Sequence, residues 1–473
     1  MRICVAARVA ASVFLLSSAT AAWAQESQPE VSPEPAPPAD TTTLPEVVVE
    51  TTEQEQAAPK QKKQKTSSST AQTYAAQEAS ASPPQTGTTG RGEETGRGPV
   101  KDYNATQTAT GTKTDTPLNE IPQSISVVGA EQIRDMGAQT EQDVLRYLPG
   151  VVADSYGYDG RAGGSFIRGT DGTEYLDGMR RTFNYYTSSY RINPYFMERV
   201  EVLRGPASVL YGQAAVGGII NSVSKLPQDY EGGEFTVEYG NFDYKQVKFD
   251  MTGALTSDRR WSYRLTGLAR DADTQTDYVE NDSYAIQPAL TFKPASGTSI
   301  TVLGHFQKDE AGSNSQFYPH IGTIFPNVSG NRISQDRFVG EPSDHYDTDV
   351  ASGTLLIDHE FNDVFKLHHS SSYTDLHNDY ASTYAGHFSA RPSLGYIYYP
   401  YLNPEQTETA RIKSKTITDT QVFTQDTNMQ AKFATGLIEH KVLGGIDYAN
   451  YQTDSVSGSA LNDTPFDVYN PVY

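Results

Sequence analysis

The feature that most constrains the fold is an alternation of apolar and polar residues in the second half of the chain. Apolar side chains occupy every second position of residues 235–239, 247–251 and 261–265, and the pattern returns in further segments as far as residue 448. A period of two describes strands with one apolar face and one wet face. From residue 233 onward the sequence therefore predicts an extended set of antiparallel strands.

The connections between these strands differ in length. Short turns are expected at residues 256–258 and 294–297, whereas residues 310–349 and 377–415 are expected to be long loops that carry Tyr and Gly. Short turns at one end and long loops at the other, with aromatic residues near the strand ends, are typical of an outer-membrane β-barrel. A secreted β-sandwich or adhesin shows the same alternation and remains the alternative.

Composition excludes two further classes of protein. The chain carries 58 acidic against 37 basic side chains, a formal net charge of −21, and this acidity disfavours nucleic-acid binding. Beyond the N-terminus there is no run of about 18 apolar residues, which a membrane-spanning helix requires. Strands that meet lipid only at every second residue need no such run, so a β-barrel stays open.

The N-terminus has the layout of a secretory signal peptide. Arg2 and Arg8 precede an apolar run at residues 9–16, and the small-residue site Ala22-Trp23-Ala24 follows. We expect residues 1–24 to be the signal, with cleavage near Ala24. Cys4 is the only cysteine and leaves with the signal, so the mature protein is expected to contain no disulfide, cysteine nucleophile or zinc–thiolate site.

Residues 25–114 are predicted to be a disordered extension. They consist mainly of Gln, Ser, Thr, Pro, Ala and Glu, a composition that buries too little apolar surface to offset chain entropy. One β-branched island, residues 44–51, interrupts the segment. Such an island can add as a strand to the sheet edge of another protein, or it is an accidental apolar patch in a linker.

Residues 115–228 are predicted to form a compact α/β domain. Strand signals at residues 125–128, 175–177 and 200–203 alternate with helix signals. Thr140 is a candidate helix cap, with Asp143 three residues later in a box-like position.

A series of motifs in this domain resembles the plug domain of TonB-dependent siderophore receptors. The similarity is closest to the ferric-hydroxamate, ferrichrome-type branch. The resemblance implies an α/β plug domain followed by antiparallel transmembrane β-barrel strands, in an outer-membrane barrel of about 22 strands. The matching segments, in chain order, are residues 109–128, 147–151, 167–169, 175–178, 194–212 and 217–221.

Several plug motif residues are interpreted as architectural. The charges among them lie on or near one strand, and inside a water-lined lumen they can pair with each other and with carboxylates of the barrel wall. Removing one partner of a buried pair costs about 3–5 kcal/mol. Gly205-Pro206 suits a turn into a short helix. The residues assigned to this structural role are Arg168, Glu198, Arg199, Glu201, Arg204 and Gly205.

The resemblance also implies a ligand in which the metal ion is already coordinated. A ferric siderophore already surrounds its iron with oxygen atoms, so no cofactor and no protein-bound metal are expected, and the receptor needs aromatic walls and hydrogen-bond donors. The apices of the plug loops and one barrel loop supply the candidates. The predicted ligand-binding residues are Tyr156, Tyr158, Arg161, Phe183, Tyr185, Tyr186, Phe317 and Tyr318, with barrel-loop tyrosines 396, 398 and 399 as weaker candidates.

The resemblance implies a protein partner for the apolar island at residues 44–51. Receptors of this type pair a short extended box with the periplasmic protein TonB, which couples them to an energising complex in the inner membrane. The candidate box is Pro45, Glu46, Val47, Val48, Val49, Glu50 and Thr51. The 64 residues from Thr51 to Asp115 would span about 45 Å as a flexible coil.

The length is the main departure from this family. After residue 232 there are 241 residues, with about nine strand candidates, against about 22 strands in a closed barrel around such a plug. We therefore expect an incomplete barrel over residues 233–473 and a C-terminally truncated sequence.

The sequence favours no enzyme. It contains no G-x-S-x-G elbow, P-loop, H-E-x-x-H or strand-linked G-x-G-x-x-G motif. Uptake of haem, a vitamin or a nickel complex on the same scaffold remains an alternative; residues 387–392 superficially resemble a haem-receptor box. The expected function is TonB-dependent uptake of a ferric siderophore across the outer membrane of a Gram-negative bacterium.

Overall fold

The structure is a computed structural model that describes residues 94–473, except 156, 158, 162, 182, 184–188, 314–315 and 387–400. The described residues belong to one compact unit of the chain. The predicted signal peptide, most of the predicted extension and the candidate TonB box at residues 45–51 lie outside them. Among the described residues, no helix is both long and apolar enough to cross a membrane.

The first part of the described chain is an α/β domain built on a five-stranded sheet. The strand order is β3-β9-β10-β7-β8, in which β7 and β10 are parallel and the other pairs are antiparallel. The sheet strands are β3 (Ser124–Gly129), β7 (Thr173–Leu176), β8 (Met179–Arg180), β9 (Met197–Arg204) and β10 (Gly218–Ser224). The predicted strands at 125–128, 175–177 and 200–203 correspond to β3, β7 and β9.

Short elements surround this sheet. Thr140 caps α3 as predicted, because its side chain accepts from the Asp143 amide while the Asp143 carboxylate accepts from the Thr140 amide. The remaining elements are β1 (Gln107–Thr108), β2 (Thr116–Pro117), η1 (Leu118–Glu120), α2 (Ala130–Asp135), α3 (Glu141–Leu145), β4 (Val151–Val152), β5 (Phe166–Ile167), β6 (Thr170–Asp171), η2 (Pro194–Phe196) and α4 (Ser208–Tyr211).

The central strands of the domain are completely buried. Every residue of β9 and β10 is buried, because the five-stranded sheet is covered on both faces. A cluster that includes Leu145, Ile167 and Phe196 continues into side chains of the second part of the chain, such as Leu268 and Val350. The α/β domain and the large sheet therefore share one apolar core.

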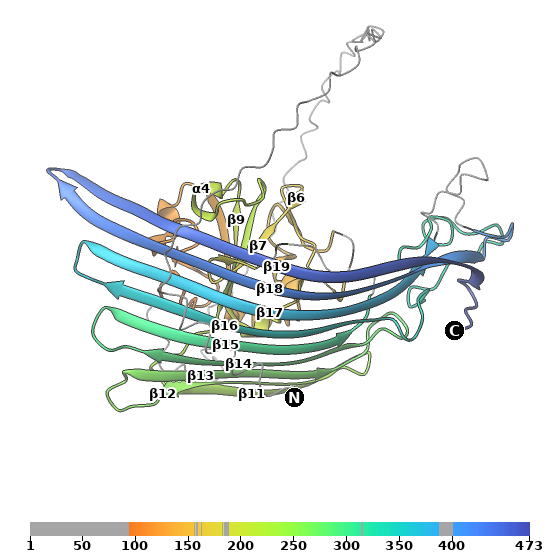
Figure 1. The fold of residues 1–473 in the computed structure, drawn as a ribbon, viewed down its shortest axis with the longest axis horizontal. Coiled ribbons are helices and arrows are strands. Elements are labelled where there is room, and N and C mark those ends of the chain that lie inside the picture. Colours follow the sequence, from red (N-terminus) through yellow and green to blue (C-terminus); the bar gives the residue numbers. More distant parts are fainter. Residues whose placement is uncertain are drawn as a thin grey trace, which may run out of the picture. The chain divides into compact units, whose positions relative to one another are not determined.

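The second part is a nine-stranded antiparallel sheet in simple chain order (Figure 1). Its strands are β11 (Gly232–Tyr239), β12 (Lys245–Ala254), β13 (Trp261–Asp271), β14 (Asn281–Phe292), β15 (Thr298–Ala311), β16 (His345–Glu360), β17 (Phe365–Ala385), β18 (Glu408–Thr435) and β19 (Ile438–Asp467). The number agrees with the predicted nine. In the described part of the chain, β11 and β19 each pair on one side only, so the predicted incomplete barrel is what the structure contains.

The two faces of this sheet differ as the alternation predicts. In β14, Tyr284, Ile286 and Leu290 are exposed, while the alternate residues Ser283 and Gln287 are buried on the opposite face, where Gln287 donates to the Phe196 carbonyl of the α/β domain at 3.4 Å. Apolar residues outside and polar residues inside are the arrangement of a membrane barrel. At the short-turn end, the rings of Trp261 and Phe292 stack at 4.3 Å between centroids, as expected for an interfacial aromatic girdle.

The predicted bounds of the loop at residues 377–415 are wrong at both ends, because the loop is shorter than expected. Strand β17 continues to Ala385 and β18 begins at Glu408. These strand ends are rich in Asp, Ser, Thr and Lys, so they carry no apolar alternation even though their backbones pair in full register. The apolar pattern marks only the part of a strand that faces lipid.

Candidate functional site

A network of charges joins the α/β domain to the large sheet. Glu198 of β9 accepts a hydrogen bond from Arg264 of β13 at 3.2 Å, and Arg264 also binds Asp250 of β12 through two nitrogens at 2.7 and 2.9 Å. Lys225, which follows β10, binds the same Asp250 at 2.8 Å. The wall partner of Glu198 is thus an arginine, and the wall carboxylate of this network, Asp250, binds Arg264 and Lys225 and not one of the motif arginines.

Arg199 holds the start of the domain. Its side chain is fully buried and pairs with Glu201 at 3.1 Å. Its guanidinium also donates to the carbonyl oxygens of Gly98, Thr95 and Gln107 at 2.6 to 3.1 Å. A single arginine therefore fixes the segment that leads into β1 against β9.

Arg204 and Gly205 shape the end of β9. Arg204 donates to the Pro149 carbonyl at 2.6 Å and to the Ser126 hydroxyl at 3.0 Å. Gly205 has φ +97°, and Arg168 has φ +50°. A left-handed backbone at residue 205 favours glycine, because a Cβ strains this conformation. In the described part of the chain, the hydrogen-bond partners of the Arg204 guanidinium are therefore neutral.

Arg161, a predicted ligand residue, is buried and engaged within the protein. Its Nε and Nη2 atoms donate to the two Asp159 oxygens at 2.9 and 2.7 Å, and Nη1 donates to the Tyr380 hydroxyl at 2.7 Å. Tyr380 lies on β17, so Arg161 fixes a plug loop to the wall. A ligand would have to replace these partners to reach the guanidinium.

The other described candidates lie in separate surroundings. Phe183 stacks on Tyr451 of β19 at 5.3 Å between centroids. The Phe317 side chain is 46% exposed. Tyr318 donates to the Arg337 carbonyl and packs against the loop cluster of residues 333, 339, 401, 466 and 468. Tyr156, Tyr158, Tyr185, Tyr186 and the tyrosines at 396, 398 and 399 lie outside the described residues.

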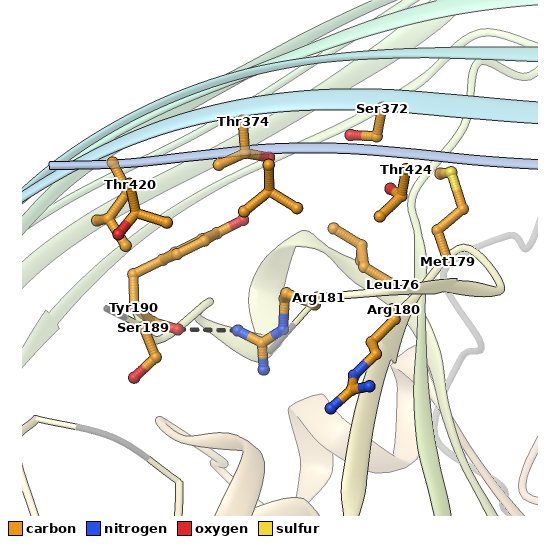
Figure 2. A pocket seen from close by; sticks show the side chains of 12 residues that line it. Leu176, Met179, Arg180, Arg181, Ser189, Tyr190, Ser372, Thr374, Thr420 and Thr424 are labelled. Atoms are coloured by element: carbon orange, nitrogen blue, oxygen red, sulfur yellow. Dashed lines mark hydrogen bonds between the residues drawn. The ribbon is translucent and has the colours of Figure 1, made fainter. Parts of the chain in front are cut away.

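A cavity that the sequence analysis did not predict lies between the domain and the wall. It has a volume of about 30 Å³ and is lined on one side by residues near β7 and β8, among them Met179, Arg181 and Tyr190. Ser372 and Thr424, among other residues of β17 and β18, form the opposite side (Figure 2). A sequence signal was present, since Ser or Thr occupies alternate positions 370, 372 and 374 of β17 and 416, 418 and 420 of β18.

Arg181, which lines this cavity, belongs to a cluster of buried charges. Arg181 binds Glu174 at 2.6 Å and lies 3.6 Å from Glu141, and Ser222 donates to Glu141 at 3.0 Å. Two carboxylates thus share one guanidinium. Burial, reinforced by the neighbouring Glu174 carboxylate, raises the pKa of Glu141 to about 7. The cluster can therefore take up a proton near neutral pH.

Comparison of the sequence with known proteins agrees with this architecture. A family model described as the TonB-dependent Receptor Plug Domain matches residues 117–219. The ferrichrome outer membrane transporter and phage receptor of Escherichia coli K12 is 34% identical over 390 residues, which cover 80% of this chain and 52% of the relative. The ferrioxamine receptor of Yersinia enterocolitica is 32% identical, covering 79% of this chain and 51% of the relative.

Solved structures show the same fold. The ferric-catecholate import receptor Fiu of Escherichia coli K12 superposes with a TM-score of 0.66 at 21% identity, over 78% of this chain and 52% of that chain. The chain spans about half the length of the curated relatives it matches. The resemblance inferred from the motifs is thereby confirmed: the chain is similar to TonB-dependent receptors in its plug segment and to the ferrichrome and ferrioxamine receptors over about half of their length.

Proposed function

We propose that this protein is an outer-membrane receptor that imports a ferric siderophore of the hydroxamate type into the periplasm of a Gram-negative bacterium. The observation that carries the proposal is the α/β plug held by ion pairs and hydrogen bonds against the polar face of a sheet whose other face is apolar. Such a wall separates lipid from a lumen, and the plug fills that lumen.

The hydroxamate class is supported by the sequence relatives. Those with the highest identities reported above are named for ferrichrome and ferrioxamine, and both of these chelates hold iron through hydroxamate oxygens. Iron is the cargo in this proposal and arrives already coordinated. The receptor recognises the outer surface of the chelate, for which aromatic and hydrogen-bonding side chains are suited.

Uptake of labelled iron tests the proposal. The receptor, expressed from its own gene in a strain that lacks other siderophore receptors, is expected to import radioactive iron supplied as ferrichrome or ferrioxamine B. Haem and cobalamin serve as competitors and are expected to leave the rate unchanged. Growth on haem with no uptake of either hydroxamate chelate would contradict the proposal.

Energy coupling is proposed to enter through residues 45–51. TonB would add this segment as a strand to its own sheet, and proline removes the backbone N–H that such pairing uses. Val48→Pro is therefore expected to abolish uptake and to leave chelate binding within about twofold of wild type. Ser80→Pro, elsewhere in the same extension, is the matched control and should transport normally; equal loss of binding and uptake in Val48→Pro would refute the assignment.

A further inference from the structure

We propose that the outer face of the wall binds a membrane lipid with a zwitterionic phosphoethanolamine head group. The site is a groove of about 750 Å³ that crosses strands β13 to β18 near the ends that carry the long loops. This volume lies within the range of sites for drug-sized ligands, about 300–1,000 Å³. We call it the lipid groove. Its main lining residues are Tyr284, Phe306, Lys308, Asp349, Ala351 and Asp375.

The lipid groove opens on the face of the wall that points away from the plug. Phe306 of β15 is exposed, while its neighbours His305 and Gln307 are buried. Gln307 contacts the plug, because it donates to the Arg191 carbonyl at 2.6 Å. Successive residues of a strand point to opposite faces of the sheet. The side chains of Phe306 and Lys308 therefore point outward, to the side on which a barrel meets the membrane.

Small side chains form the floor of the groove. Ala269 on β13 lies opposite Tyr284, and Ala351 on β16 lies opposite Phe306, so each alanine shares the outer face with a large neighbour. Tyr284, Ile286 and Phe306 are all exposed and line the groove. The two alanines thus leave a recess between aromatic and aliphatic side chains. Such a recess can take up the acyl chain of a lipid.

A row of polar side chains borders the recess on the side of the long loops. Its members lie directly opposite one another in the register of five consecutive strands. They are Tyr284, Lys308, Asp349, His377 and Asp419. Tyrosine residues of membrane proteins gather at the boundary between hydrocarbon and head groups. The row therefore lies at the depth where a lipid in the recess would place its head group.

Two carboxylates of the groove lack an ion pair in the described structure. They are Asp349, in the row, and Asp375, which lies opposite Ala351 and nearer the short-turn end. Within the part of the chain that the structure describes, neither side chain accepts a hydrogen bond either. By contrast, Asp419 is hydrogen-bonded to His377 at 2.7 Å. The groove therefore presents negative charge to which a cationic group of a ligand can donate.

Lys308 provides the opposite charge beside these carboxylates. It lies directly opposite Asp349, and the Cβ atoms of residues paired in this way are about 4.5–5.5 Å apart. Lys308 also pairs with Glu310, but its ammonium has three N–H donors and can bind a phosphate as well. A phosphoethanolamine head group joins a phosphate to an ammonium through a short ethylene link. Its two charges are complementary to Lys308 and Asp349.

Native mass spectrometry of the receptor tests the head group. The receptor, expressed from its own gene and purified in detergent, is incubated with phosphatidylethanolamine, phosphatidylcholine and phosphatidylglycerol that have identical acyl chains. Choline has no N–H to donate, and the glycerol head group has no cation. Because hydrogen bonds to charged groups stabilise a complex, we expect wild type to bind about tenfold more phosphatidylethanolamine than either other lipid.

Carboxylate variants locate the site. Asp349→Asn and Asp375→Asn, each on its own, are expected to remove most of the preference for phosphatidylethanolamine. Asp454→Asn is the matched control, since Asp454 is exposed in the same row on β19, opposite Asp419 and outside the groove. This control should keep the preference of wild type.

A further substitution tests the recess independently of the carboxylates. Ala351→Phe fills the floor of the groove and is expected to lower phosphatidylethanolamine binding to the level of the other two lipids. Leu355→Phe, on the same face of β16 but outside the groove, should bind as wild type does. Heat-modifiable migration on gels shows whether each variant is folded, and Asp349→Glu, which keeps the charge, should retain the preference.

Several results would overturn the proposal. One is equal binding of the three lipids by wild type. Another is a preference for phosphatidylglycerol that requires Mg²⁺, because the carboxylates would then bind a metal ion and not an ammonium. A preference for phosphatidylethanolamine that survives in both folded carboxylate variants would also contradict it. The test uses no siderophore, so its failure and the failure of the proposed function are separate results.

Discussion

One buried arginine, Arg199, connects the entry segment of the plug to its central strand. We expect Arg199→Met to destabilise this connection by about 3–5 kcal/mol, because Glu201 would keep a buried charge without its partner. Hydrogen exchange of residues 95–108 measures the effect. Arg146→Met is the control: its side chain is 52% exposed, and surface pairs contribute about 0–1 kcal/mol. Unchanged protection in Arg199→Met would refute the role.

The Glu141 cluster predicts a pH dependence of plug stability. The folded plug keeps a proton on Glu141 up to a pKa of about 7, against an ordinary value of 4.5. The resulting stabilisation is complete below about pH 4.5 and is lost as the pH rises through 7, with a total on the order of 3 kcal/mol. Opening free energies from hydrogen exchange at residues 141–145 should fall over this range in wild type and stay level in Glu141→Gln. Parallel profiles would exclude Glu141 as the source.

The ligand candidates show what sequence motifs leave undetermined at the residue scale. Arg161 could be identified from its place in a loop motif, but its partner Tyr380 lies 219 residues away. Only the fold brings these two together. By contrast, the Thr140–Asp143 cap is local in the chain and was predictable from residue spacing alone.

At the scale of elements, the lipid-facing alternation predicted the strands but not their full lengths. Residues 365–373 carry the apolar pattern, yet β17 extends to Ala385. Beyond the lipid boundary both faces are wet, so composition no longer distinguishes a strand from a loop. The inner face was even less predictable, since hydroxyl and amide side chains suit many environments.

The depth of the apolar face can be tested on two neighbouring strands. Val302 on β15 is 54% exposed in the middle of the outward apolar series, while Tyr284 on β14 lies at its loop end. We expect Val302→Arg to destabilise the folded barrel in lipid by about 2–4 kcal/mol and Tyr284→Arg by about 0–1 kcal/mol. Folding titrations in phospholipid vesicles measure both. Equal costs would show that this face does not meet hydrocarbon.

For the molecule as a whole, sequence motifs identified the plug and the alternation identified the wall, but neither showed how the two are joined. Lys225 and Asp250 are 25 residues apart, and Glu198 and Arg264 are 66 apart. Pairing of this kind depends on how the wall curves around the plug. Because both the plug and the wall carry charged residues, ion pairs between them could be predicted. Which residues pair could be learned only from the structure.

The contacts of Asp250 with Arg264 and Lys225 predict how firmly the plug is attached to the wall. The Asp250 carboxylate accepts from Arg264, Lys225 and the Thr266 hydroxyl, and an amide in its place offers a single oxygen and no charge. We expect Asp250→Asn to weaken the hold on the plug by about 3–5 kcal/mol, since two buried cations lose their shared anion.

Weaker attachment of the plug to the wall should let solutes pass through the receptor more easily. Cells with Asp250→Asn are expected to admit a large hydrophilic antibiotic several times faster than wild type, and protease should cleave the plug sooner in the purified receptor. Asp258→Asn, in an exposed turn where the side chain is 55% accessible, should change neither measurement. If Asp250→Asn stays as tight as this control, the plug is held by its other contacts with the wall, among them the ion pair of Lys113 with Asp426 on β18, and the ion pairs at β12 and β13 fix only its orientation.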